Sequence, residues 1–103
     1  MARRLKTAII TGAGSGVGRA TATALLKAGY NVTLAGRRID ALEETKSLSG
    51  ETQGNSFVVA TDITNEDSVL ELFQRTCQEF GHLDLLFNNA GANVPGIPFE
   101  DLS

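Results

Sequence analysis

The stretch TGAGSGVG at residues 11–18 decides the fold of this chain. It overlaps the end of TAIIT at residues 7–11, a β-branched run that predicts a buried strand. It leads into residues 16–28, whose spacing predicts a helix that ends at Gly29. A turn without side chains at this junction lets the backbone approach a phosphate group closely, and the N–H groups that begin the helix then face that group. The stretch therefore indicates a phosphate-binding turn.

Glycine-rich segments also arise where no ligand binds. A tight turn, a close contact between helix and strand, or plain linker composition each produces such a segment, and these alternatives stay open. The glycines stand at positions 12, 14, 16 and 18, which is not the strict GxGxxG order. The location at the first strand-to-helix junction nevertheless favours phosphate binding.

The rest of the chain repeats the alternation of short apolar runs and helical patterns. Further strands are predicted at residues 31–35, 56–60 and 83–87. Further helices are predicted at residues 39–48 and 64–80, the latter opened by Thr64 and Asp67 as a capping pair. The segment after Ala92 has no periodicity and predicts a loop. Strands separated by helices, with no hairpin signal, predict an α/β fold with a parallel sheet.

Apolar spacing predicts which face each helix buries. On the first helix these residues are Val17, Ala20, Ala24, Leu25 and Ala28. On the second they are Ile39 and Leu42. On the third they are Val69, Leu72, Phe73, Thr76 and Phe80, with Cys77 beside them.

Composition narrows the class of protein. The 103 residues have room for one domain, expected over 1–103, and 42% hydrophobic with 20% charged residues is ordinary for a globular chain. A net charge of −3 without a basic cluster argues against binding of nucleic acid. No apolar run is long enough to span a membrane. The single cysteine excludes an internal disulfide and a cysteine-based metal site. We therefore expect a small cytoplasmic domain without a metal.

Two arginines follow the second predicted strand. Counting about 20 residues from Gly16 leads to Gly36, Arg37 and Arg38, where a dinucleotide site needs a group facing the adenosine ribose. A carboxylate would bind the 2′-hydroxyl, whereas arginine pairs with a 2′-phosphate. The pair favours NADP over NAD. The alternative is that one or both arginines are solvated charges that open the next helix.

Three segments together resemble the short-chain dehydrogenase/reductase family. They are TGAGSGVG at 11–18, Asp62-Ile63-Thr64 after the third strand, and NNAG at 88–91 after the fourth. The resemblance covers nearly the whole chain. It implies a Rossmann-type sheet of strand order 3-2-1-4, truncated relative to a full family domain.

The resemblance also implies a role for individual residues in binding a nicotinamide dinucleotide. Gly12, Gly16 and Gly18 match the family's TGxxxGxG turn, Gly14 lies within it, and Ser15 and Val17 would contact ribose and pyrophosphate. Asp62 would bind the adenine amino group, and the Ile63 amide a ring nitrogen. Asn89, Ala90 and Gly91 would line the ribose. Arg37 matches the position that marks NADP-preferring members.

The family's catalytic serine, tyrosine and lysine have no counterpart in this sequence. Its only tyrosine is Tyr30, and the residue four positions on is Leu34 rather than lysine. We therefore expect the N-terminal part of an oxidoreductase that transfers hydride between nicotinamide and a carbonyl or alcohol. One alternative is a non-catalytic nucleotide-binding or partner-binding module. Another is a methyl-transfer domain that binds S-adenosylmethionine, against which the lack of an acidic residue at Gly36-Arg37 argues.

The sequence also indicates the roles of one strand edge and of three single residues. The fourth strand would have an exposed apolar edge, Leu85 to Phe87, that favours self-association or a homo-oligomer. His82 is expected to be a solvated loop residue, and Cys77 a buried, inert thiol. Arg19 either assists phosphate binding or is an ordinary residue of a surface helix.

Overall fold

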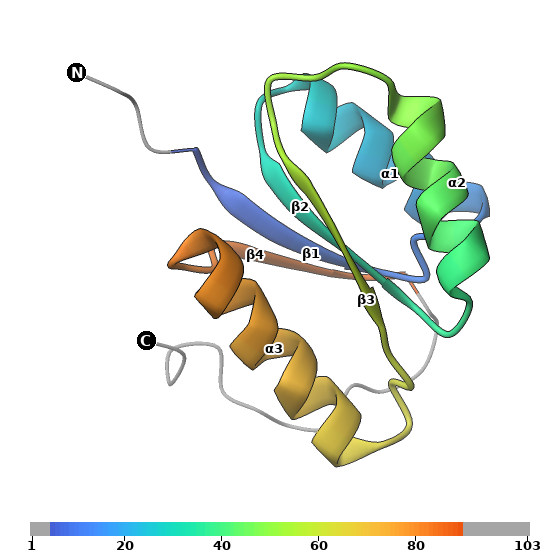
Figure 1. Ribbon diagram of the computed structural model, residues 1–103, viewed down its shortest axis with the longest axis vertical. Coiled ribbons are helices and arrows are strands. Elements are labelled where there is room, and N and C mark those ends of the chain that lie inside the picture. Colours follow the sequence, from blue (N-terminus) through green and yellow to red (C-terminus); the bar gives the residue numbers. More distant parts are fainter. Residues whose placement is uncertain (1–4, 90–103) are drawn as a thin grey trace.

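Residues 5–89 are described by the computed structural model, and they alternate strictly between strand and helix (Figure 1). The elements in chain order are β1 (Thr7–Thr11), α1 (Gly16–Lys27), β2 (Asn31–Gly36), α2 (Ile39–Ser49), β3 (Ser56–Ala60), α3 (Glu66–Phe80) and β4 (Leu85–Asn88). The strands form one sheet in the order β3-β2-β1-β4, and each neighbouring pair is parallel. The predicted Rossmann-type fold and strand order are confirmed.

The register brings the carboxyl ends of the strands to one edge of the sheet. Thr11 of β1 lies opposite Ala35 of β2 on one side and Asn88 of β4 on the other. Gly36 of β2 pairs with Ala60 of β3. The segments that follow β1, β2, β3 and β4 therefore start close together, and this edge is where an open α/β sheet binds its ligands.

Two hydrophobic clusters cover the two faces of the sheet. α1 and α2 pack on one face, where Leu26 and Leu42 meet Ile10, Val32 and Leu34. α3 packs on the opposite face, as Figure 1 shows. Burial on both faces explains why the strands are apolar runs rather than alternating patterns.

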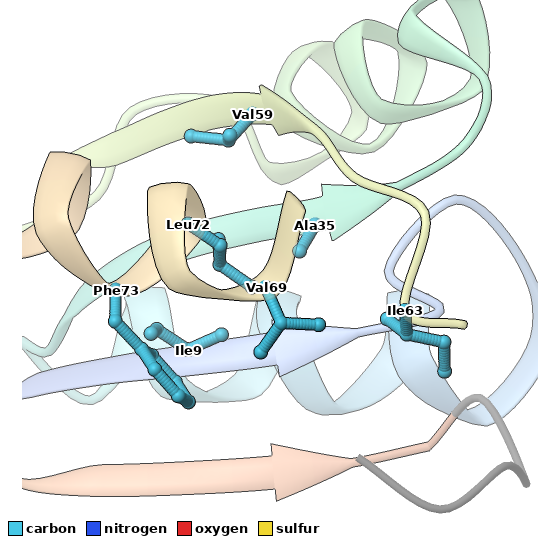
Figure 2. Packing of buried hydrophobic residues seen from close by; sticks show 7 residues of the cluster. All are labelled: Ile9, Ala35, Val59, Ile63, Val69, Leu72 and Phe73. Atoms are coloured by element: carbon cyan, nitrogen blue, oxygen red, sulfur yellow. The ribbon is translucent and has the colours of Figure 1, made fainter. Parts of the chain in front are cut away.

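The α3 cluster anchors the sheet (Figure 2). Ile9, Ala35 and Val59 come from three neighbouring strands, and side chains from α3 and from Ile63 pack onto them. Phe73 is the largest fully buried side chain of the described residues, with 1% of its surface exposed. This face of the core fixes the position of the segment after β3, to which Ile63 belongs.

The predicted inner face of α1 is wrong except for Leu25, which is half-buried and packs against the sheet cluster. The buried residues are Gly18, Ala22 and Leu26, which are spaced four apart, whereas Val17 is 71% exposed. Gly18 sets this face, because a Cβ there would collide with the carbonyl oxygen of Gly12 and only glycine allows so close a contact with the end of β1. Sequence spacing missed it because alanines occur on several sides of the helix and carry little signal.

Two further predictions for helix residues are also corrected. Ile39 is 54% exposed, whereas Leu42 lies inward as predicted, together with Thr45 and Ser49. The N-cap of α3 is Asn65, whose Oδ1 accepts a hydrogen bond from the Ser68 amide at 3.0 Å. Thr64 does not cap the helix, because its hydroxyl donates to Asp62 Oδ1 at 2.6 Å.

The residues before β4 are bound to β1 by side chains. β4 begins at Leu85, two residues later than expected, after Asp84 has accepted a bond from the Thr7 amide at 2.8 Å. His82 is not a solvated loop residue, since its side chain is only 17% exposed. Its Nε2 lies 2.8 Å from the Leu5 carbonyl oxygen and 3.2 Å from Asp84 Oδ2. The predicted loop after Ala92 lies outside the described residues.

Candidate functional site

The carboxyl edge of the sheet contains a cleft of about 740 Å³. All four segments that follow the strands contribute to it. Its lining consists of Gly12, Gly14, Ser15, Gly16, Val17, Gly18, Gly36, Arg37, Arg38, Ala41, Leu42, Thr61, Ile63, Thr64 and Asn89. The cleft thus brings together the sequence-predicted residues from the four segments, except that Asp62 is flanked by lining residues without being one. Ala90 and Gly91 lie outside the described residues.

The glycines of the turn serve two different geometric needs. Gly12 and Gly16 have φ values of 63° and 54°, the left-handed region that side chains disfavour. Gly14 and Gly18 instead permit close approach. A Cβ on Gly14 would lie 2.9 Å from the Cβ of Ala41 in α2, and one on Gly18 would meet the Gly12 carbonyl. The close helix–strand contact that the sequence left open as an alternative is therefore present within the same turn that lines the cleft.

The N-terminus of α1 carries no side-chain cap. Ser15 is the N-cap residue, it makes no capping hydrogen bond, and the first turn holds no acidic residue. α3, in contrast, is capped by Asn65 and has Glu66 and Asp67 in its first turn. The first N–H groups of a helix have no partner within the helix and carry a partial positive charge. The end of α1 is thus left available to an anion in the cleft.

Arg37 and Arg38 stand exposed at the end of β2, each beside a carboxylate. Arg37 Nη2 lies 3.2 Å from Asp62 Oδ1, and Arg38 Nη2 lies 2.9 Å from Asp40 Oδ2. The hydrogen bond and charge of Asp40 raise the pKa of Arg38, and Arg38 in turn lowers the pKa of Asp40. Exposed pairs of this kind are weak. Both guanidinium groups can therefore exchange these carboxylates for a stronger anionic partner.

Asp62 closes a turn directly after β3. Its Oδ1 accepts bonds from the Thr64 hydroxyl at 2.6 Å and from the Thr64 amide at 3.0 Å. These two bonds, followed by the nearby Arg37 charge, lower the pKa of Asp62. The Asp62 amide donates to Ser68 Oγ at 2.9 Å, which ties the turn to α3. Asp62 is thus held as a carboxylate at the rim.

Thr11 has a role in the site that the sequence did not predict. Its hydroxyl donates to Asn88 Oδ1 at 3.0 Å and accepts from the Asn89 amide at 3.0 Å, which joins the end of β1 to the segment after β4. The feature of the sequence that could have indicated this role is the position of Thr11 as the last residue of a central strand. The buried side-chain Nδ2 of Asn89 has no hydrogen-bond partner among residues 5–89. A buried donor left without a partner is costly, so this group favours a ligand acceptor in the cleft.

The residues present fit a dinucleotide. The uncapped helix end can take a pyrophosphate, the glycines leave room for it, and the unpartnered Asn89 Nδ2 can donate to a ribose oxygen. Within residues 5–89, no group of three or more His, Cys, Asp or Glu side chains is arranged to hold a metal ion. In the same range, none of the helices combines the length and the apolar character needed to cross a bilayer.

Comparison with known proteins identifies the sequence family of this chain. The profile of the family described as short chain dehydrogenase matches residues 6–103. An uncharacterized oxidoreductase of Staphylococcus aureus (strain N315) is 45% identical over 86 residues, which are 84% of this chain and 36% of that protein. The chain thus spans little more than a third of the length of this relative.

Solved structures share the fold over a similar part of their length. A short chain dehydrogenase from Bacillus anthracis gives a TM-score of 0.80 at 37% identity, covering 97% of this chain and 40% of that one. An alcohol dehydrogenase from the archaeon Thermococcus sibiricus, complexed with 5-hydroxy-NADP, gives 0.74 at 35% identity, with 80% and 35% covered. A 3-ketoacyl-(acyl-carrier-protein) reductase from Brucella melitensis, complexed with NADH, gives 0.71 at 33% identity, with 79% and 32% covered. Since the family profile covers nearly the whole sequence and relatives match it in both identity and fold, this chain belongs to the short chain dehydrogenase family.

Proposed function

We propose that this chain binds a nicotinamide dinucleotide, with NADP preferred, across the carboxyl edge of its sheet. We further propose that it forms the cofactor-binding part of an oxidoreductase that transfers hydride between the nicotinamide and a carbonyl or alcohol. The observation that carries the proposal is the shared cleft, in which the uncapped end of α1 meets Arg37, Arg38 and the unpartnered Asn89 side chain. The bound cofactor would supply the redox chemistry, and this chain would supply binding and orientation.

Each segment of the cleft has one part of the cofactor to hold. The turn of Gly12, Gly14, Ser15, Gly16, Val17 and Gly18 would receive the pyrophosphate and its neighbouring ribose. Asp62 and the Ile63 amide would hold the adenine. Asn89, with Ala90 and Gly91, would hold the remaining ribose through side-chain and backbone donors.

The preference for NADP rests on Arg37 and Arg38. Both line the cleft directly after β2, and their present carboxylate partners are exposed and weakly held. A 2′-phosphate offers a planar, charge-assisted pairing that a 2′-hydroxyl lacks. Relatives in this fold have been solved with either cofactor type, namely 5-hydroxy-NADP in the Thermococcus enzyme and NADH in the Brucella enzyme. The arginines favour the former for this chain.

One observation favours a second candidate, a binding module that does not catalyse by itself. Tyr30 precedes β2 and the residue four positions on is the fully buried Leu34, so this chain offers no tyrosine–lysine pair at the cleft. In that case the chain binds NADPH but reduces no carbonyl compound. We also propose self-association of two copies through β4, where Phe87 is 41% exposed and no strand of residues 5–89 pairs with the outer side. The cytoplasmic location stays a prediction.

Direct titration of the chain with NADPH and NADH tests the proposal. Calorimetry should give one site per chain and tighter binding of NADPH. Carbonyl-dependent oxidation of NADPH by the native gene product, isolated from its own cells, separates the two candidates, since the module binds without turnover. A chain that binds neither dinucleotide contradicts both.

A further inference from the structure

Arg19 follows the last glycine of the turn, yet it is not among the residues that line the cleft. Its side chain is 25% exposed and is held against α2. Nη2 donates to the Gly14 carbonyl oxygen at 2.6 Å and to the Ala41 carbonyl oxygen at 3.2 Å. Nε donates to Thr45 Oγ1 at 2.9 Å, and Nη1 pairs with Glu44 Oε1 at 3.1 Å. All three guanidinium nitrogens are therefore engaged, which fits neither a phosphate ligand nor an ordinary surface residue.

Thr45 of α2 completes the same network. It is fully buried, and its hydroxyl donates to the Ala13 carbonyl oxygen at 2.7 Å while accepting from Arg19. The Ala41 carbonyl lies 3.2 Å from the same hydroxyl. Side chains thus hold two consecutive carbonyl groups of the glycine-rich turn. Thr45 of α2 holds that of Ala13, and Arg19 of α1 holds that of Gly14.

Holding these carbonyls fixes the amides that follow them. In a planar trans peptide the N–H points opposite to the C=O, so the N–H groups of Gly14 and Ser15 are turned away from the partners that hold the two oxygens. A glycine-rich turn has no intrinsic preference for this orientation, because glycine rotates more freely than other residues. A carbonyl oxygen turned into the cleft would repel a phosphate.

We propose that Arg19 and Thr45 are positioning residues for the pyrophosphate of the cofactor. They act through the carbonyls of Ala13 and Gly14, and keep amide N–H groups rather than carbonyl oxygens available to the anion. Donors oriented in advance bind more tightly than donors that must reorganise. This inference rests on the proposed dinucleotide site, and assigns two residues outside that site to its phosphate-binding half.

Three ligands separate positioning from general stability. ADP carries the pyrophosphate, 2′-AMP carries the adenosine and the 2′-phosphate without it, and NADPH carries all of these groups. Thr45→Val keeps the shape of the side chain but removes the hydroxyl. The affinity of this variant for ADP and NADPH should fall about tenfold, because the hydrogen bond that holds the Ala13 carbonyl is lost. Its affinity for 2′-AMP should stay unchanged. Thr45→Ser, which keeps the hydroxyl, should restore ADP binding.

Thr76→Val is the matched control. Thr76 is also a fully buried helical threonine whose hydroxyl bonds the carbonyl four residues back, that of Leu72, but it lies in α3 on the other face of the sheet. Its loss should lower the thermal stability and leave the affinity for both nucleotides unchanged. Arg19→Lys keeps the charge but cannot reproduce the fork of contacts, so it should weaken ADP binding nearly as much as Arg19→Gln does.

Calorimetric titration of the whole chain, at a temperature where thermal melts show each variant folded, gives the result. The positioning role is overturned if Thr45→Val and Arg19→Gln bind ADP as the wild type does, or lose ADP and 2′-AMP in equal proportion. Full rescue by Arg19→Lys would assign the effect to charge and overturn it as well. A wild-type chain that binds none of the three ligands overturns the proposed function, and the positioning role with it.

Discussion

Replacing Gly16 by alanine separates the binding role of the turn from its contribution to stability. Gly16 has a φ of 54°, and a Cβ built on it meets nothing within 4 Å, so the new methyl group has space in the folded chain. The left-handed conformation costs an alanine about 1–2 kcal/mol. For a domain of this size, such a loss lowers the melting temperature by about 4–16 °C.

Gly81 provides a control with the same backbone problem elsewhere. It ends α3 with a φ of 85° and a ψ of −12°, and a Cβ there also meets nothing within 4 Å. Gly81→Ala should therefore lose about as much stability as Gly16→Ala. It is not a cleft residue, so the binding of NADPH should not change.

Gly16→Ala should weaken NADPH binding in addition. Gly16 is the first residue of α1 and lines the cleft, so its methyl group would stand where a phosphate approaches the helix N-terminus. Losing one hydrogen bond to a charged group, about 1.5–3 kcal/mol, corresponds to a decrease in affinity of about 10- to 150-fold. Calorimetric titration and thermal melts of both variants measure the two effects separately. If Gly16→Ala melts lower as expected but binds NADPH like Gly81→Ala, the phosphates do not lie at this turn, and the reasoning is refuted.

Four other outcomes are expected. Arg37→Glu combined with Arg38→Glu should weaken NADPH binding far more than NADH binding in parallel titrations, and equal losses would remove the NADP assignment. Phe73→Ala should lower the free energy of unfolding by about 3–5 kcal/mol in urea, because the side chain is 1% exposed in the α3 cluster; a loss below about 1 kcal/mol would mean that this cluster is loosely packed. Because the pKa of Asp62 is lower in the folded chain than its ordinary value of 3.8, the ionised carboxylate stabilises the fold at pH values above 3.8. This stabilisation is lost as the pH falls through the lower folded-state pKa. Asp62→Asn should therefore be less stable than wild type at neutral pH, with a difference that shrinks in acid; urea unfolding at several pH values would show a constant difference if the carboxylate had no such role. Phe87→Lys should reduce self-association in sedimentation experiments, and an unchanged oligomer would exclude the β4 edge as its interface.

The two central strands of the sheet were predictable from sequence because they are buried on both faces. All residues of β1 and all but the last of β2 are buried, so each strand stands out as an uninterrupted apolar or β-branched run that a glycine ends. The strand order came from the family resemblance, since apolar runs alone do not say which strands are neighbours. The cleft followed from the same topology, because parallel strands bring their carboxyl ends to one edge.

The contacts made by polar side chains were not predictable in this way. His82 and Arg19 have the sequence surroundings of surface residues, yet their partners are as distant along the chain as Leu5 and Thr45. Thr64 and Asn65 are both good N-cap residues, and the choice between them depends on Asp62, which takes the Thr64 hydroxyl. Such choices depend on tertiary neighbours rather than on spacing.

The irregular glycine spacing, which counted against phosphate binding in the sequence, has a structural reason. Gly14 is required by the approach of α2, since a Cβ there would lie 2.9 Å from the Cβ of Ala41. The same approach brings Thr45 within reach of the Ala13 carbonyl and of Arg19, whose Nη2 holds the Gly14 carbonyl. The additional glycine is therefore not a departure from a phosphate-binding turn but a condition for holding that turn from behind. On this argument Gly14→Ala would push α2 away and loosen both carbonyls at once, so it should impair ADP binding even though the turn keeps its left-handed glycines at 12 and 16.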